Sequence, residues 1–149
     1  MLTRQQIMAL IPHQGSMCLL DVVTAWSADG ITCGASSHLA PENPLRRDGR
    51  LSAVCGIEYG LQAAALHSAL MRGEAGHDAF APPGYLAALR GVDLQVERLD
   101  DASFGTLQVT ARPELRTAGG LIYRFAVASE AGAPLLHGRA TIVFATRPA

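Results

Sequence analysis

The chain has 149 residues, of which 49% are hydrophobic and 17% are charged. This length and this apolar share predict one domain over residues 1–149 with a sizeable core, and they exclude a disordered tail, a collagen-like repeat and a small disulfide-stabilised protein. Twelve basic and thirteen acidic side chains give a net charge of -1. Such a near-balance argues against broad electrostatic binding to nucleic acid or to an anionic membrane, since both need a basic excess.

The three cysteines point to a reducing compartment. Cys18, Cys33 and Cys55 are odd in number, widely spaced and surrounded by apolar residues, which is typical of free thiols rather than of a disulfide framework or a zinc site. The first residues lack the pattern of a secretory signal, and no stretch reaches about 18 uninterrupted apolar residues, the length that a membrane span needs. We therefore expect a cytoplasmic protein without a membrane span.

Helical and strand-like segments follow one another in an order typical of an α+β protein. We expect a short helix over 3–10, a hairpin of strands over 17–26 and 31–38, a loop over 40–50, a long helix over 51–71, a loop over 73–83, and strands over 85–98, 106–115, 121–129 and 134–146. Thr3 and Gln6 have the spacing of a capping box, and the long helical segment is rich in alanine and leucine. Tight turns between the last strands indicate a mainly antiparallel sheet. A helix that is apolar on most faces then calls for a curved sheet around it, and for a partner subunit as well.

Glu58 is the one formal charge between residues 51 and 71. Burial of a carboxylate among apolar residues disfavours its charged form and raises its pKa, which produces a general acid or base near neutral pH. Gln62 lies one turn further along the same face, where it can hydrogen-bond the carboxylate or a ligand amide. Two interpretations stay open: Glu58 is a catalytic group, or it is a solvated glutamate at the one wet edge of the helix or beside an arginine of the 46–50 loop.

His13 is the second candidate catalytic residue. It lies between a proline and a glycine, which fix the backbone and allow a ligand to approach closely, and histidine is the commonest general base. The alternative is a structural histidine at the end of the first helix. His38 is a further candidate, whereas His77 and His137 are expected to be surface or packing residues. No group of His, Asp and Glu has metal-ligand spacing on one element, so no metal is predicted.

Arg46, Arg47 and Arg50 form a basic cluster before the long helix. It is either a solvated loop that balances nearby acids or a landing point for a phosphate or an acidic carrier protein. The GxSxG, Walker A and GxGxxG motifs are absent from the sequence. Serine-hydrolase, P-loop and dinucleotide-binding functions therefore have no support.

Three segments in chain order carry a family resemblance. Residues 10–23 contain LIPH and then LLDVV, residues 56–63 contain an acid followed four residues later by a glutamine, and residues 84–89 read GYLAAL. Together they resemble the dehydratases that act on 3-hydroxyacyl groups of acyl carrier protein, and most of all the dehydratase-like group of aryl polyene gene clusters. The resemblance spans about residues 7–144. It implies the hotdog fold, a long central helix wrapped by a curved, mainly antiparallel sheet of about six strands and usually paired as a homodimer.

The resemblance also implies roles for individual residues. The acid of the family's helix falls on Glu58 and its glutamine on Gln62, and backbone N–H groups of Ala53 and Val54 would polarise the thioester carbonyl. The family places a catalytic histidine before the helix, but residues 43–50 contain none. Either His13 has taken over the base role, or Glu58 works with another partner, or the chain is no longer a dehydratase.

The activity that this resemblance implies is dehydration of 3-hydroxyacyl thioesters to trans-2-enoyl thioesters. His13 would take the C2 proton and Glu58 would protonate the departing hydroxyl, while Gln62, Arg46 and Arg47 contact a substrate carried by acyl carrier protein or CoA. No cofactor is needed. Two alternatives stay open: a hotdog thioesterase in which Glu58 activates water, and a non-catalytic protein that binds acyl chains or carrier protein.

Overall fold

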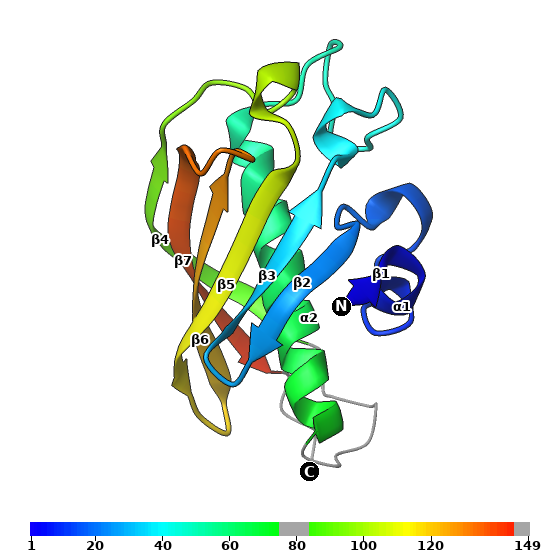
Figure 1. The fold of residues 1–149 in the computed structure, drawn as a ribbon. Helices are drawn as coiled ribbons and strands as arrows, with labels where there is room; N and C mark the ends of the chain where they lie inside the picture. Colours follow the sequence, from blue (N-terminus) through cyan, green and yellow to red (C-terminus); the bar gives the residue numbers. More distant parts are fainter. Residues whose placement is uncertain (75–83, 145–149) are drawn as a thin grey trace.

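The computed structural model describes residues 1–74 and 84–144, and it contains one antiparallel sheet with a long helix against one face (Figure 1). The helices are α1 (Arg4–Met8) and α2 (Gly56–Glu74), and the strands are β1 (Leu2–Thr3), β2 (Val22–Ser27), β3 (Gly30–Ala35), β4 (Gly84–Leu94), β5 (Leu107–Arg116), β6 (Gly120–Ala128) and β7 (Pro134–Phe144). The strand order is β1-β2-β3-β5-β6-β7-β4. This arrangement confirms the predicted α+β class and the hotdog fold, with seven strands rather than six.

The long helix is held against the sheet by a closely packed face. Tyr59, Ala63 and Leu66 are fully buried, and the helix contacts β3, β5, β6 and β7. Gly60 allows a close approach, because a Cβ at this position would lie 2.6 Å from the ring of Phe125. The helix therefore has one face fixed in the core and another that turns away from the sheet.

The first helix forms as its sequence predicts. The hydroxyl of Thr3 accepts the backbone N–H of Gln6, and the Gln6 side chain accepts the N–H of Thr3. This capping box satisfies two of the N–H groups that a helix leaves unpaired at its start. The prediction was too long at the other end, since α1 stops at Met8.

Several predicted boundaries are wrong. β3 ends at Ala35 rather than at residue 38, and β4 ends at Leu94 rather than at residue 98. Two others differ for local reasons. Residues 17–21 are not part of a strand, because Met17 closes a short 3-10 turn and β2 begins only at Val22. The long helix begins at Gly56 rather than at residue 51, because the preceding residues Ala53–Cys55 form a separate 3-10 turn capped by the hydroxyl of Ser52. The regular α-helix therefore starts five residues later in the chain than predicted.

Strand β4 forms an edge of the sheet and carries uncovered apolar side chains. Leu86, Leu89 and Leu94 are 46%, 38% and 42% exposed. Leu89 and Leu94 pair in register with Ala140 and Leu136 of β7, which are both buried, so these leucines lie on the helix side of the sheet. In the described part of the chain, α2 and the other elements leave this apolar surface open.

The three cysteines are free thiols, as the sequence predicts. Cys18 and Cys33 are buried and Cys55 is half-buried, and all three are free. Burial raises the pKa of Cys33 to about 12, so its thiol stays protonated near neutral pH. Neither helix within residues 1–74 and 84–144 has the length and apolar character needed to cross a membrane.

Candidate active site

A cavity of about 600 Å³ lies beside α2, and both predicted catalytic side chains line it. His13 comes from the segment after α1, and Glu58 comes from the first turn of α2. The rest of the wall is mostly apolar and includes Leu61, Ala64, Ala65, Leu86, Leu121, Ile142 and Phe144. Segments far apart in the sequence therefore meet around one hollow that combines an imidazole and a carboxylate with apolar walls, as small-molecule sites usually do.

Glu58 is exposed, which corrects the expectation of a buried carboxylate. Its neighbours Ile57 and Tyr59 are buried, but adjacent helical residues point about 100° apart, so their burial does not extend to the residue between them. No ion pair joins Glu58 to an arginine of the 46–50 loop in the described residues. The wet edge of the helix is thus the edge that faces the cavity.

His13 is half-buried, and its Nδ1 atom is buried with no hydrogen-bond partner in the described residues. The loop around it is fixed by Gln14, whose amide donates to the carbonyls of Met8 and Ile11. Gly15 follows with a φ of +57°, a conformation that favours glycine. An unpaired buried nitrogen on an ordered loop is unusual and is compatible with a functional group. No hydrogen bond connects His13 with Glu58 in this structure.

Gln62 is buried and has a positioning part in the fold. Its Nε2 donates to the carbonyl of Met17 at 2.8 Å, and its Oε1 accepts the N–H of Leu19 at 2.9 Å. These two bonds fix the segment that leads from the His13 loop into β2. Gln62 does not line the cavity, so its contacts do not support the expected contact with substrate.

The expected carbonyl-polarising amides are also engaged elsewhere. The N–H of Ala53 donates to the carbonyl of Glu97 at 3.0 Å, and the N–H of Val54 faces the hydroxyl of Ser52 at 3.4 Å. Neither residue lines the cavity. The reason is the 3-10 turn before α2, which moves these amides away from the start of the long helix.

Arg46 is a structural residue rather than a free surface cation. Its guanidinium donates to the carbonyls of His38, Ala40 and Gly49 and to the carboxylate of Asp100, at 2.8 to 3.2 Å. These bonds hold the 40–50 loop together, which corrects the expectation that Arg46 receives a phosphate. Arg47 and Arg50 are exposed, and only they keep the character of a basic surface.

Sequence reasoning missed a buried polar network behind the site. The Tyr59 hydroxyl lies 2.7 Å from the Ser37 hydroxyl and accepts from the Asn43 amide at 3.1 Å. Ser37 in turn donates to the carbonyl of Leu19 at 2.7 Å, so Tyr59 donates to Ser37. Burial raises the pKa of Tyr59. The network attaches the 40–50 loop to α2, and its long sequence separations gave no signal beyond a tyrosine within an apolar helix.

The other histidines that the structure describes do not line the cavity. His38 is fully buried with both ring nitrogens unpaired in the described part of the chain, and burial lowers its pKa. His137 lies on β7 with its Nε2 3.5 Å from the carboxylate of Asp93. His77 lies outside the described residues. Within residues 1–74 and 84–144, His, Cys, Asp and Glu side chains form no cluster of three that could hold a metal ion.

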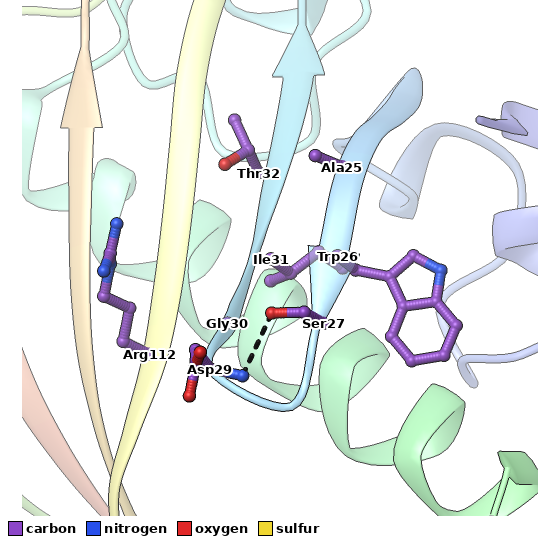
Figure 2. Close-up of a pocket in the computed structure, with 8 residues that line it drawn as sticks. All are labelled: Ala25, Trp26, Ser27, Asp29, Gly30, Ile31, Thr32 and Arg112. Carbon is purple, nitrogen blue, oxygen red and sulfur yellow. Dashed lines mark hydrogen bonds between the residues drawn. The ribbon is translucent and has the colours of Figure 1, made fainter.

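A second hollow, of about 310 Å³, lies at the β2–β3 turn and offers less chemistry. Figure 2 shows Asp29 in the turn, with Arg112 of β5 and Trp26 of β2 pointing away to opposite sides. The Ser27 hydroxyl accepts the N–H of Asp29 at 3.1 Å and closes the turn. This hollow contains no histidine, so the cavity beside α2 is the stronger candidate for acid–base chemistry.

Comparison of the chain with known proteins finds one family model and several solved structures of the same fold. The model of the ApeP-like family, described as ApeP dehydratase, matches residues 5–147, whereas no curated protein sequence matches significantly. The dehydratase heterocomplex ApeI:P from Xenorhabdus doucetiae superposes with a TM-score of 0.79 at 22% identity, covering 99% of this chain and 93% of that chain. AziG from S. sahachiroi gives 0.61 at 14% identity, covering 85% and 91%. A mutant thioesterase from Pseudomonas aeruginosa gives 0.61 at 14% identity, covering 95% and 93%.

Proposed function

Because this chain belongs to the ApeP-like dehydratase family, we propose that it removes water from 3-hydroxyacyl thioesters and forms trans-2-enoyl thioesters in polyene-type or fatty-acid biosynthesis. The single observation that carries this proposal is the shared cavity, in which His13 and Glu58 lie within one mostly apolar wall. An apolar wall suits an acyl chain, and two titratable groups suit the transfer of two protons.

The proposed reaction assigns one proton to each group. His13 takes the proton from C2, the C3–O bond breaks, and Glu58 donates the proton with which the hydroxyl leaves as water. The electron pair of the C2–H bond becomes the C2–C3 double bond. Proton exchange with solvent then returns both groups to their starting forms, and this cycle consumes no redox equivalent.

We propose that the thioester reaches the cavity on acyl carrier protein or on CoA. Both carriers have anionic groups, and exposed arginines recognise phosphate and carboxylate oxygens well. Arg47 and Arg50 are exposed on the loop before α2, whereas Arg46 is occupied by loop carbonyls and Asp100. Replacement of Arg47 and Arg50 is therefore the test of carrier docking.

We further propose that a second copy of this chain covers β4. Among its exposed leucines, Leu86 also lines the cavity. The structurally similar dehydratase from X. doucetiae is a heterocomplex, so association with a further chain is known for a protein of this fold. A covered β4 would exclude water from one side of the cavity, which strengthens electrostatic interactions inside it.

The deciding experiment follows 3-hydroxyacyl and 2-enoyl thioesters of pantetheine and of carrier protein in both directions. We expect interconversion by the wild-type protein and a rate at least about 100-fold lower in Glu58→Gln and in His13→Gln, the usual contribution of a general acid or base. His137→Gln, a histidine away from the cavity, is the matched control. Wild-type protein that shows no interconversion with any of these substrates would refute the proposal.

A thioesterase is the second candidate, and the exposure of Glu58 favours it. A carboxylate in contact with water can activate that water against a thioester carbonyl. Separate measurement of free thiol and of enoyl product distinguishes the two reactions. Release of thiol without formation of enoyl product would replace the dehydratase by a thioesterase, and tight acyl binding without either product would indicate a non-catalytic protein.

A further inference from the structure

The cavity beside α2 is longer than an acid–base pair requires. Its α2 wall includes Glu58, Leu61, Ala65, Ser68 and Arg72, and steps of three or four residues place them in one stripe along the helix. Fourteen residues separate the first from the last, which corresponds to about 21 Å at the helical rise. The cavity therefore joins two charged ends, a carboxylate at one and a guanidinium at the other.

The wall between these ends suits a hydrocarbon chain. On the helix it includes Leu61, Ala64 and Ala65, with Ser68 as a polar member one turn before Arg72, and on the strands it includes Leu121 and Ile142. The pantetheine arm of a carrier contains two amides, and amides that lose water without finding partners are costly. The apolar stretch therefore fits the acyl chain better than the arm, and the chain extends from Glu58 toward the far end.

The far end is positively charged. Arg72 lines it and is half-buried, and Arg116 is the register partner of the cavity residue Leu121. Both arginines are near Tyr123: burial raises the pKa of this tyrosine, and the two guanidinium groups act in the opposite direction. Neither arginine forms an ion pair within residues 1–74 and 84–144.

We propose that Arg72, assisted by Arg116, determines specificity by binding an oxygen-bearing distal end of the acyl chain, best an anionic one. A half-buried cation at the end of an apolar wall gains a charge-assisted hydrogen bond when an acceptor, above all an anionic one, reaches it. The preferred ligand is then an acyl thioester that ends in a carboxylate or another strong hydrogen-bond acceptor, rather than in a methyl group. This assignment rests on the proposed function, because that function places the thioester beside Glu58.

Binding of unreactive ligands tests the proposal without turnover. The probes are pairs of acyl-pantetheine analogues in which an amide replaces the thioester, each pair of equal length with either a methyl or a carboxylate end. At one chain length we expect wild-type protein to bind the carboxylate-ended analogue about tenfold more tightly. In Arg72→Met this preference should vanish while the affinity for the methyl-ended analogue persists, and Arg72→Lys should restore part of it.

Arg112→Met is the matched control, because Arg112 lies at the other hollow and not in this cavity. Thermal unfolding verifies that the variants fold, and Arg116→Met provides a second, weaker loss of the preference. Equal affinities in the wild-type protein at every chain length would overturn the proposal, as would a preference that survives in Arg72→Met. A failed dehydratase assay alongside a preserved binding preference would refute only the proposed reaction.

Discussion

A single buried amide shows how the site is positioned at the residue scale. Gln62 has its two polar atoms bonded to the backbone at Met17 and Leu19, and these bonds connect α2 to the segment that follows His13. The side chain thus acts on the cavity through the backbone. Replacement of Gln62 should therefore lower the free energy of unfolding more than it lowers the affinity for substrate.

We predict that Gln62→Leu lowers the free energy of unfolding by about 2–3 kcal/mol. The substitution leaves the buried N–H of Leu19 and the partly buried carbonyl of Met17 without partners. A buried unpaired group costs about 1–3 kcal/mol, and a partly buried one that water still reaches costs less. Chemical denaturation measures the change. Gln108→Leu is the control, because Gln108 is exposed and donates one bond to the Glu130 carbonyl; a smaller loss for Gln62→Leu than for this control would contradict the prediction.

His67 makes stability depend on pH. Its Nε2 lies 2.7 Å from the carbonyl of Ser27 and therefore donates, and its Nδ1 lies 2.7 Å from the hydroxyl of Tyr123 and accepts. Burial lowers the pKa of His67 below its ordinary value of 6.5. Between the lowered folded pKa and 6.5, the unfolded chain binds the proton and the folded chain does not. Acid therefore stabilises the unfolded state and lowers the free energy of unfolding in this range.

We accordingly predict full stability above pH 6.5 and a loss as the pH falls from 6.5 toward the folded pKa. The slope for one histidine is at most about 1.4 kcal/mol per pH unit. Unfolding free energies measured across this range should fall less steeply in His67→Gln than in wild type. Burial also lowers the pKa of His38, so part of the slope should remain; an unchanged slope in His67→Gln would be inconsistent with this account.

The sequence predicted which side chains line the cavity better than it predicted their surroundings. Glu58 and His13 both line the cavity. They could be predicted because a charge within an apolar helix and a histidine between a proline and a glycine are local signals. The predictions of a buried Glu58 and of a phosphate-binding Arg46 were wrong, because exposure and hydrogen bonding depend on segments that are distant in sequence. Arg46 resembles a surface cation until Asp100, 54 residues later, is placed beside it.

At the scale of one element, α2 contains glycines with opposite requirements. A Cβ at Gly60 would lie 2.6 Å from the ring of Phe125, whereas a Cβ at Gly73 would meet no atom within 4 Å. Both positions are helical, and alanine is favoured over glycine in a helix by about 1 kcal/mol. Packing and helix propensity therefore oppose each other at one position and not at the other.

We predict that Gly60→Ala destabilises the protein by about 1–3 kcal/mol despite the gain in helix propensity, because overpacking of a core costs this much. Gly73→Ala should leave stability unchanged or raise it by less than about 1 kcal/mol, since the last turn of a helix contributes little. Unfolding free energies of the two variants make a matched comparison. A stabilising Gly60→Ala would show that the helix moves away from β6 at little cost.

The elements were predictable mostly where periodicity is local. The capping box of α1, the last four strands and the body of α2 followed from residues close together in sequence. Strand β1, with two residues, is too short to produce a pattern. The place of β4 beside β7 was not predictable either, because the order of strands depends on which edges meet in space and not on the turns between neighbours.

At the scale of the whole molecule, the exposed apolar side chains of the edge strand β4 favour association with another chain. An exposed edge strand with apolar side chains promotes association with another chain. Leu89 is 38% exposed on β4, and Val54, before α2, is 51% exposed. Leu86 of the same strand lines the cavity, so a chain that covers β4 also completes the wall of the candidate active site.

We predict that the wild-type protein is a dimer in solution and that Leu89→Lys converts it to a monomer. A charge placed in a buried apolar interface costs several kcal/mol in association, but the same charge is tolerated on an exposed strand of the free chain. Light scattering coupled to size-exclusion chromatography measures the mass, and circular dichroism verifies the fold.

Leu115→Lys, at a position 53% exposed on β5, should remain dimeric. A monomeric wild-type protein, or a dimeric Leu89→Lys, would exclude β4 as the interface. If the interface is correct, the monomeric variant should also lose activity, because one wall of its cavity then opens to water.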